Sequence, residues 1–162
     1  MPTPFPHLFQ PIRIGAKQSR NRVMRLATST NSGKNGMATD VTVAIYRRLA
    51  RGGTGFIVSE SMRVHPSNTG RNANAMLMYQ KEIIPSIAKL AQAVHDEGAL
   101  LVAQLNHGGR QFHGNSAPNL WAPSAIACPH SGGIPHQMTK AEIAEVVAGF
   151  AQAALHAQQA GC

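Results

Sequence analysis

Polar side chains follow three short apolar runs of this sequence, at points where strands of a parallel sheet would end. The first run leads into residues 27–31, the second ends in Ser59, Glu60 and Ser61, and the third carries Gln104. A buried amide without a partner costs about 1–3 kcal/mol, so Gln104 needs hydrogen-bond partners. A planar ligand edge with both donors and acceptors meets that need, and so does neighbouring backbone. The first alternative predicts a ligand site at the carboxyl ends of the strands.

Two further groups of residues have side chains that act in catalysis or metal binding in other proteins. His107 and Arg110 follow Gln104 and suit either a catalytic role or a structural role in the turn after the strand, and we favour the structural role. Cys128, His130 and His136 are potential zinc ligands. Their spacing matches no standard zinc motif and lacks an obvious fourth ligand, so we predict no metal site.

The elements that must position these residues follow from the alternation of short apolar runs with helical patterns. This alternation is typical of β/α units around a parallel sheet. The expected elements are a hairpin with strands at 12–14 and 22–27 joined by a turn at 15–19, further strands at 55–59 and 99–105, and helices at 39–51, 81–97 and 139–160.

The ends of the expected helices carry recognisable signals. Thr39 can cap the first helix, and Gly52-Gly53 can end it. Thr139 and Glu142 match a capping box at the start of the third. Apolar spacing predicts the inward faces as Val41, Ala44, Ile45 and Leu49 on the first helix, Ile83, Ile84, Ile87, Leu90, Ala91 and Val94 on the second, and Ile143, Val146, Val147 and Phe150 on the third.

Composition is typical of one globular domain. The chain has 162 residues, of which 43% are hydrophobic and 14% charged. No apolar run reaches the roughly 18 residues of a membrane span, and two cysteines without a secretory signal favour the cytoplasm. The net charge of +8 suggests a nucleic-acid partner, but no basic run exceeds Arg47-Arg48 and no aromatics alternate with it. A solvated basic face is therefore the favoured interpretation.

Several ordered motifs resemble one known family. LFQPIRIG followed by NRVMRLATSTN resembles the opening hairpin and first strand of old yellow enzyme relatives, the NADH:flavin oxidoreductases. ARGGTGFIVSES, LVAQLNHGGR, LWAPSAIA and FAQAALHAQQAGC resemble later segments of the same family, in the same order. The resemblance covers essentially the whole chain. It implies a TIM (β/α)8 barrel, of which residues 1–162 supply the N-terminal hairpin and the first three βα units.

The resemblance also implies a cofactor and its contacts. Family members hold FMN at the barrel mouth, take electrons from NADH or NADPH, and pass hydride to an activated alkene such as an enone or a dienoyl thioester. Ser61 would approach the flavin through its backbone, Gln104 would bond the pyrimidine edge, and Asn31 falls where some relatives have a substrate-side Tyr. The remaining flavin contacts implied by position are Leu26, Ala27, Thr28 and Ser29, with Ser29 replacing a Thr or Cys.

The family's catalytic residues fall after the segment that this sequence covers. In the family, the carbonyl-binding His pair, or His and Asn, comes shortly after the fourth strand begins, and the Tyr proton donor and the basic FMN-phosphate ligands come later, so we assign no catalytic residue. We expect residues 1–162 to be the N-terminal part of one FMN-binding domain, ending before the fourth strand. The full-length enzyme would act on a small alkene and could form homo-oligomers. We expect it to bind neither nucleic acid nor membrane. The alternative is a truncated, non-catalytic chain without independent activity.

Overall fold

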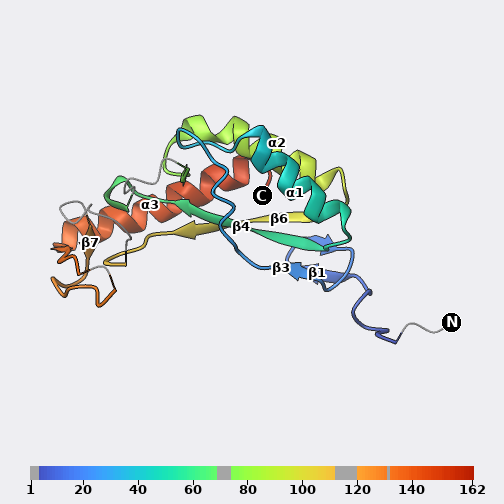
Figure 1. Cartoon of the computed structure of the whole chain (residues 1–162), viewed down its shortest axis with the longest axis horizontal. Helices are drawn as coiled ribbons and strands as arrows, with labels where there is room; N and C mark the ends of the chain where they lie inside the picture. Colours follow the sequence, from blue (N-terminus) through green and yellow to red (C-terminus); the bar gives the residue numbers. More distant parts are fainter. Residues whose placement is uncertain (1–3, 69–73, 112–119, 131) are drawn as a thin grey trace.

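The computed structural model describes residues 4–68, 74–111, 120–130 and 132–162 (Figure 1). Its elements alternate between strand and helix as the sequence predicts. In order they are β1 (Ile12–Ile14), β2 (Lys17–Ser19), β3 (Met24–Arg25), α1 (Asp40–Arg51), β4 (Phe56–Arg63), η1 (Pro66–Asn68), β5 (Met76–Leu77), η2 (Lys81–Ile83), α2 (Ile84–His95), β6 (Leu100–Asn106), β7 (Trp121–Ala122), β8 (His136–Gln137) and α3 (Lys140–Gln159).

The central sheet has four parallel strands, with β4 between its neighbours. β3 and β5 pair with β4 at different points along its length, and β6 also pairs with β4. Met24 lies opposite Phe56, and Phe56 lies opposite Leu100. β3, β4 and β6, the strands of three consecutive βα units, are therefore neighbours in the sheet, as in a β/α barrel.

The helices cover one face of the sheet. In Figure 1, α1 and α2 run side by side over β4 and β6; α1 contacts β4, and α2 contacts β6. Ile57 and Leu101 point into the core beneath them, whereas Val102 on the same strand as Leu101 is 40% exposed. The strands are thus buried on the helical face and open on the other face, which we call the open face.

The hairpin differs from the predicted one. β1 pairs antiparallel with β2, and Ile14 lies opposite Lys17 across a turn at Gly15, whose φ is 58°. The expected second strand instead contributes β3, which pairs in parallel with β4. The prediction was wrong here because β2 is a polar segment without the apolar alternation that marks a strand.

The predicted ends of the first and third helices are confirmed, whereas the second predicted helix is the 3-10 turn η2 followed by α2, which ends at His95. The predicted faces of α1 and α3 are right only for Ile45, Leu49 and Val146. Thr39 and Thr139 both form capping boxes. On α1 the buried face holds Val43, Tyr46 and Ala50, while Val41 is 61% exposed. On α3 the core contacts come from Ala153 and Ala157, and the larger residues Ile143, Val147 and Phe150 are exposed. Small side chains let α3 approach the core closely, so apolar size did not indicate the buried face.

A bulge interrupts β4 where polar residues begin. Val58 lies opposite Val102 and Ser61 lies opposite Gln104, so Ser59 and Glu60 together oppose the single residue Ala103. An extra residue of this kind re-aims the side chains that follow it. Here it turns Ser61 to the same face as Gln104 and returns Met62, which is fully buried, to the core.

Candidate functional site

Ser61 and Gln104 lie side by side at the carboxyl ends of β4 and β6. They are register partners, and the Gln104 backbone N–H donates to Ser59 Oγ at 2.9 Å. The Gln104 side chain is exposed on the open face and has no hydrogen-bond partner among the residues that the structure describes. The expectation that this amide is buried in the strand was wrong, since helices cover only one face. Its donors and acceptors are therefore free for a ligand.

The segment after β3 runs along the other side of β4. Met24 and Arg25 lie opposite Phe56 and Ile57, so the chain continues beside the bulge. The Arg25 guanidinium donates to the Leu26 carbonyl and to Thr28 Oγ1, which holds this segment in place. Leu26 is 63% exposed. The candidate contacts therefore gather along adjacent segments on the open face: Leu26, Ala27, Thr28, Ser29, Ser61 and Gln104.

Glu60 is a buried carboxylate that the sequence analysis did not single out. It is 5% exposed, and its Oε2 accepts the N–H of Thr30 at 3.0 Å and that of Asn31 at 3.3 Å. Its Oε1 accepts the Thr30 hydroxyl. A buried charge needs partners, so an acidic residue inside an otherwise apolar run was the signal that could have identified it. These bonds fix Asn31, whose φ is 52°, beside the end of β4.

Tyr46 supports the bulge from the helical side. Its hydroxyl accepts the Glu60 backbone N–H at 2.6 Å, and its side chain is 2% exposed. Burial is the main cause that raises the pKa of Tyr46 to about 12. The neutral phenol is thus the form that the fold favours, and it satisfies a backbone donor that the bulge removes from the strand ladder.

His107 makes hydrogen bonds through both of its ring nitrogens. Its Nε2 lies 3.0 Å from Ser67 Oγ, and its Nδ1 accepts the Gly109 N–H at 3.2 Å. Burial lowers the pKa of His107, and the nearby His65 ring and Arg63 guanidinium lower it further. Arg110 donates to the Ala127 carbonyl at 3.4 Å.

The zinc alternative has no geometric support. Cys128 is buried, whereas His136 lies on the surface and contacts the Glu142 carboxylate at 2.9 Å. Within the described ranges, no three His, Cys, Asp or Glu side chains lie close enough together to hold a metal ion.

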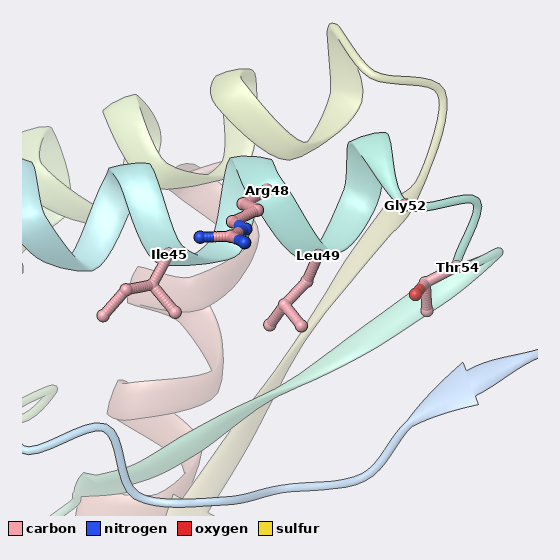
Figure 2. A pocket seen from close by; sticks show the side chains of 5 residues that line it. All are labelled: Ile45, Arg48, Leu49, Gly52 and Thr54. Carbon is pink, nitrogen blue, oxygen red and sulfur yellow. The ribbon is translucent and has the colours of Figure 1, made fainter.

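An open pocket of about 510 Å³ lies at the opposite end of the sheet (Figure 2). Ile45, Arg48 and Leu49 line it from α1, and Gly52 and Thr54 line it from the turn that leads into β4. This is the amino end of β4. Ligands of parallel β/α folds bind beyond the carboxyl ends of the strands, so this pocket lies away from the candidate site.

Comparison with known proteins identifies the family. Residues 7–162 match the model of the NADH:flavin oxidoreductase / NADH oxidase family, which binds FMN. The chain belongs to this family. The match to the NADH:flavin oxidoreductases includes every element of the described structure, from the hairpin to α3. No helix in the described part of the chain has both the length and the apolar character needed to cross a bilayer.

Individual members of the family show the same relationship. The chain is 40% identical to a metal reductase of Desulforamulus reducens over 95% of its own length and 23% of the relative's. A 2-naphthoyl-CoA reductase structure superimposes with a TM-score of 0.87 at 28% identity, covering 97% of this chain and 26% of that one. The old yellow enzyme of Pichia sp. AKU4542 gives a TM-score of 0.82 at 24% identity, covering 96% and 44%, and shows the shared fold.

These coverages describe the chain as part of a barrel. It spans 23% of the length of the Desulforamulus reducens metal reductase and 45% of the length of a Listeria monocytogenes NADPH dehydrogenase, to which it is 34% identical. The predicted fold class, a partial TIM barrel that begins with a hairpin, is confirmed. The chain's residues also fit the family's cofactor: Gln104 has an exposed side-chain amide, Ser61 is its register partner, and Leu26, Thr28 and Ser29 on the neighbouring segment are exposed. Held by these residues, FMN would supply a ring that accepts and donates hydride.

Proposed function

We propose that this chain supplies the flavin-facing N-terminal part of an FMN-dependent NAD(P)H oxidoreductase whose substrate is an activated alkene. One observation carries the proposal: Ser61 and Gln104 are register partners on the open face, and the Gln104 amide is free of partners in the described residues. A flavin pyrimidine edge offers both donors and acceptors, and a side-chain amide matches both.

The chain's own residues have distinct tasks in this proposal. Gln104 binds and orients the ring edge, and Ser61 approaches it through the backbone. Leu26, Ala27, Thr28 and Ser29 border the ring along the segment that Arg25 holds. Asn31 lies on the substrate side, with its backbone fixed by Glu60. Each contact belongs to a segment that hydrogen bonds already order, so binding costs little further conformational entropy.

Flavin titration of the Gln104→Leu variant tests the proposal. Gln104 is exposed, so the substitution should leave the free energy of unfolding within about 0.5 kcal/mol of the original while FMN affinity falls by about tenfold. Gln92→Leu is the matched control, because it removes an exposed amide on α2. Unchanged FMN affinity and potential in Gln104→Leu, with normal stability, would rule out the contact.

The 162-residue chain by itself should hold FMN weakly. Leu26 and Val102 expose 63% and 40% of their surface on the open face, and water competes for the ring there. The titration is therefore repeated in a chimera whose remaining barrel comes from the metal reductase of Desulforamulus reducens. Tight flavin binding by the isolated chain would contradict this expectation.

A further inference from the structure

Four side chains form a continuous path from the end of β6 to α3. His107 Nε2 lies 3.0 Å from Ser67 Oγ, which lies 2.7 Å from His65 Nδ1. His65 Nε2 lies 3.0 Å from the Glu145 carboxylate. We call His107, Ser67, His65 and Glu145 the relay. Its members come from three segments that are far apart in the sequence: the turn after β6, η1 with the residues just before it, and α3.

Backbone contacts show the direction of the hydrogen bonds in the relay. The Ser67 N–H points at His65 Nδ1 at 3.2 Å, and the Gly109 N–H points at His107 Nδ1 at 3.2 Å. A backbone N–H only donates, so both Nδ1 atoms are acceptors and both protons sit on Nε2. His107 therefore donates to Ser67, Ser67 donates to His65, and His65 donates to Glu145.

The relay ends at the candidate flavin site. His107 is three positions after Gln104, and its Nδ1 holds the Gly109 N–H of the following turn. The other end is anchored well: His65 is 5% exposed, and its ring packs 5.1 Å from that of Trp121. Glu145 is on the second turn of α3 and is exposed, so it reaches His65 from the surface. The charged groups near the two rings are Arg63 at the end of β4 and Glu145 on α3.

We propose that Glu145 is a positioning residue that orders the turn after Gln104 by selecting histidine tautomers. An ionised carboxylate can only accept, so the His65 nitrogen that faces it must carry the proton; this keeps the proton on Nε2 and leaves Nδ1 as the acceptor. Ser67 must then donate to His65, and its oxygen is left to accept from His107. His107 Nδ1 is thereby kept as the acceptor for Gly109. That this turn matters for catalysis rests on the proposed function, whereas the hydrogen bonds of the relay do not depend on it.

Nuclear magnetic resonance of the 162-residue chain, without flavin and near neutral pH, tests the relay. Long-range proton–nitrogen correlations report each histidine tautomer, and amide exchange reports the Gly109 hydrogen bond. In Glu145→Ala, His65 should lose its pure Nε2–H form and Gly109 should exchange about fivefold faster. Glu145→Gln should restore both, because its amide oxygen accepts the same bond. Glu82→Ala, which removes an exposed carboxylate from η2, should leave both unchanged.

Two results would overturn the proposal. One is a Glu145→Ala variant with the original tautomers and Gly109 exchange rate. The other is faster exchange throughout the chain, including the Cys162 N–H that bonds Ala157, because that would mean general loosening. Neither readout needs FMN, so failure of the relay is distinct from failure of the flavin site. If the relay and the flavin site are both correct, the FMN affinity of the chimera should also fall in Glu145→Ala and recover in Glu145→Gln.

Discussion

The Glu60 carboxylate accepts the Thr30 backbone N–H at 3.0 Å, although the two residues are 30 positions apart in the sequence. This contact joins the end of β4 to the segment that follows β3. The same carboxylate also accepts the Asn31 N–H and the Thr30 hydroxyl. One buried side chain thus sets the relative position of the two segments that carry most candidate flavin contacts.

Replacing Glu60 by Gln should destabilise the chain. The substitution keeps the size of the side chain but turns one acceptor into an NH2 group that faces other donors. Leaving such groups unpaired costs about 1–3 kcal/mol, which urea unfolding would measure. Glu97→Gln is the matched control, since Glu97 forms an exposed pair with Arg51 and should matter less. An equal loss in free energy of unfolding in the two variants would contradict the role of Glu60 in joining β4 to the Thr30 segment.

Alkaline pH should weaken the fold through Tyr46. Its pKa is raised from 10.0 to about 12, so the folded state favours the protonated phenol. The stabilisation is complete below pH 10 and is lost as the pH rises from 10 to about 12. Tyr46→Phe should lack this dependence and, at neutral pH, lose about 1–3 kcal/mol because the Glu60 N–H has no acceptor.

Cys162 must be replaced in every sample of that experiment. Burial raises the pKa of its thiol from 9.0 to about 11, which overlaps the same pH range. A Cys162→Ser background removes that contribution. Tyr79→Phe is added to it, because burial also raises the pKa of Tyr79, and tyrosinate absorbance then follows Tyr46 alone. A stability profile of Tyr46→Phe that still declines over this range would show that another group is responsible.

Gly149→Ala should destabilise the chain even though alanine is the better helix former. The helix preference favours alanine by about 1 kcal/mol. A Cβ at this position, however, would lie 2.7 Å from the Val64 carbonyl oxygen, and such overpacking costs about 1–3 kcal/mol. Gly52→Ala is the control, because its Cβ would be 3.3 Å from the nearest atom, Leu49 O, and its φ is −66°. Thermal unfolding distinguishes the two, and a more stable Gly149→Ala would contradict the close packing of α3 on Val64, the residue after β4.

Local signals in the sequence predicted the elements well. Helix ends depend on a few neighbouring residues, so Thr39 and the Thr139–Glu142 pair identified them correctly. The strands around Phe56 and Leu101 were also predictable, because a continuous apolar run bounded by glycines has few other structures available. The placement of Ser61 and Gln104 at strand ends followed from these elements.

Features that depend on distant packing were not predictable in the same way. The buried side of α3 is set by how closely Ala153 and Ala157 approach the sheet, and hydrophobicity alone favours the larger Ile143 and Val147. The role of Glu60 depends on the path of the Thr30 segment, which no local pattern indicates. The relay joins side chains from three segments and requires the fold before any member has a partner.

The bulge in β4 has a consequence for parity, the odd or even position that decides which side of a strand a residue faces. Up to Val58 the even-numbered residues face outward; after the extra residue the odd-numbered ones do, which is why Ser61 stands beside Gln104. Deleting either Ser59 or Glu60 would remove the bulge and leave Ser61 facing outward beside Gln104 and Met62 facing inward, with every later position shifted by one in number. Relatives that differ in length at this point must therefore be aligned by the side each residue faces, because counting positions would exchange core residues with ligand-facing ones.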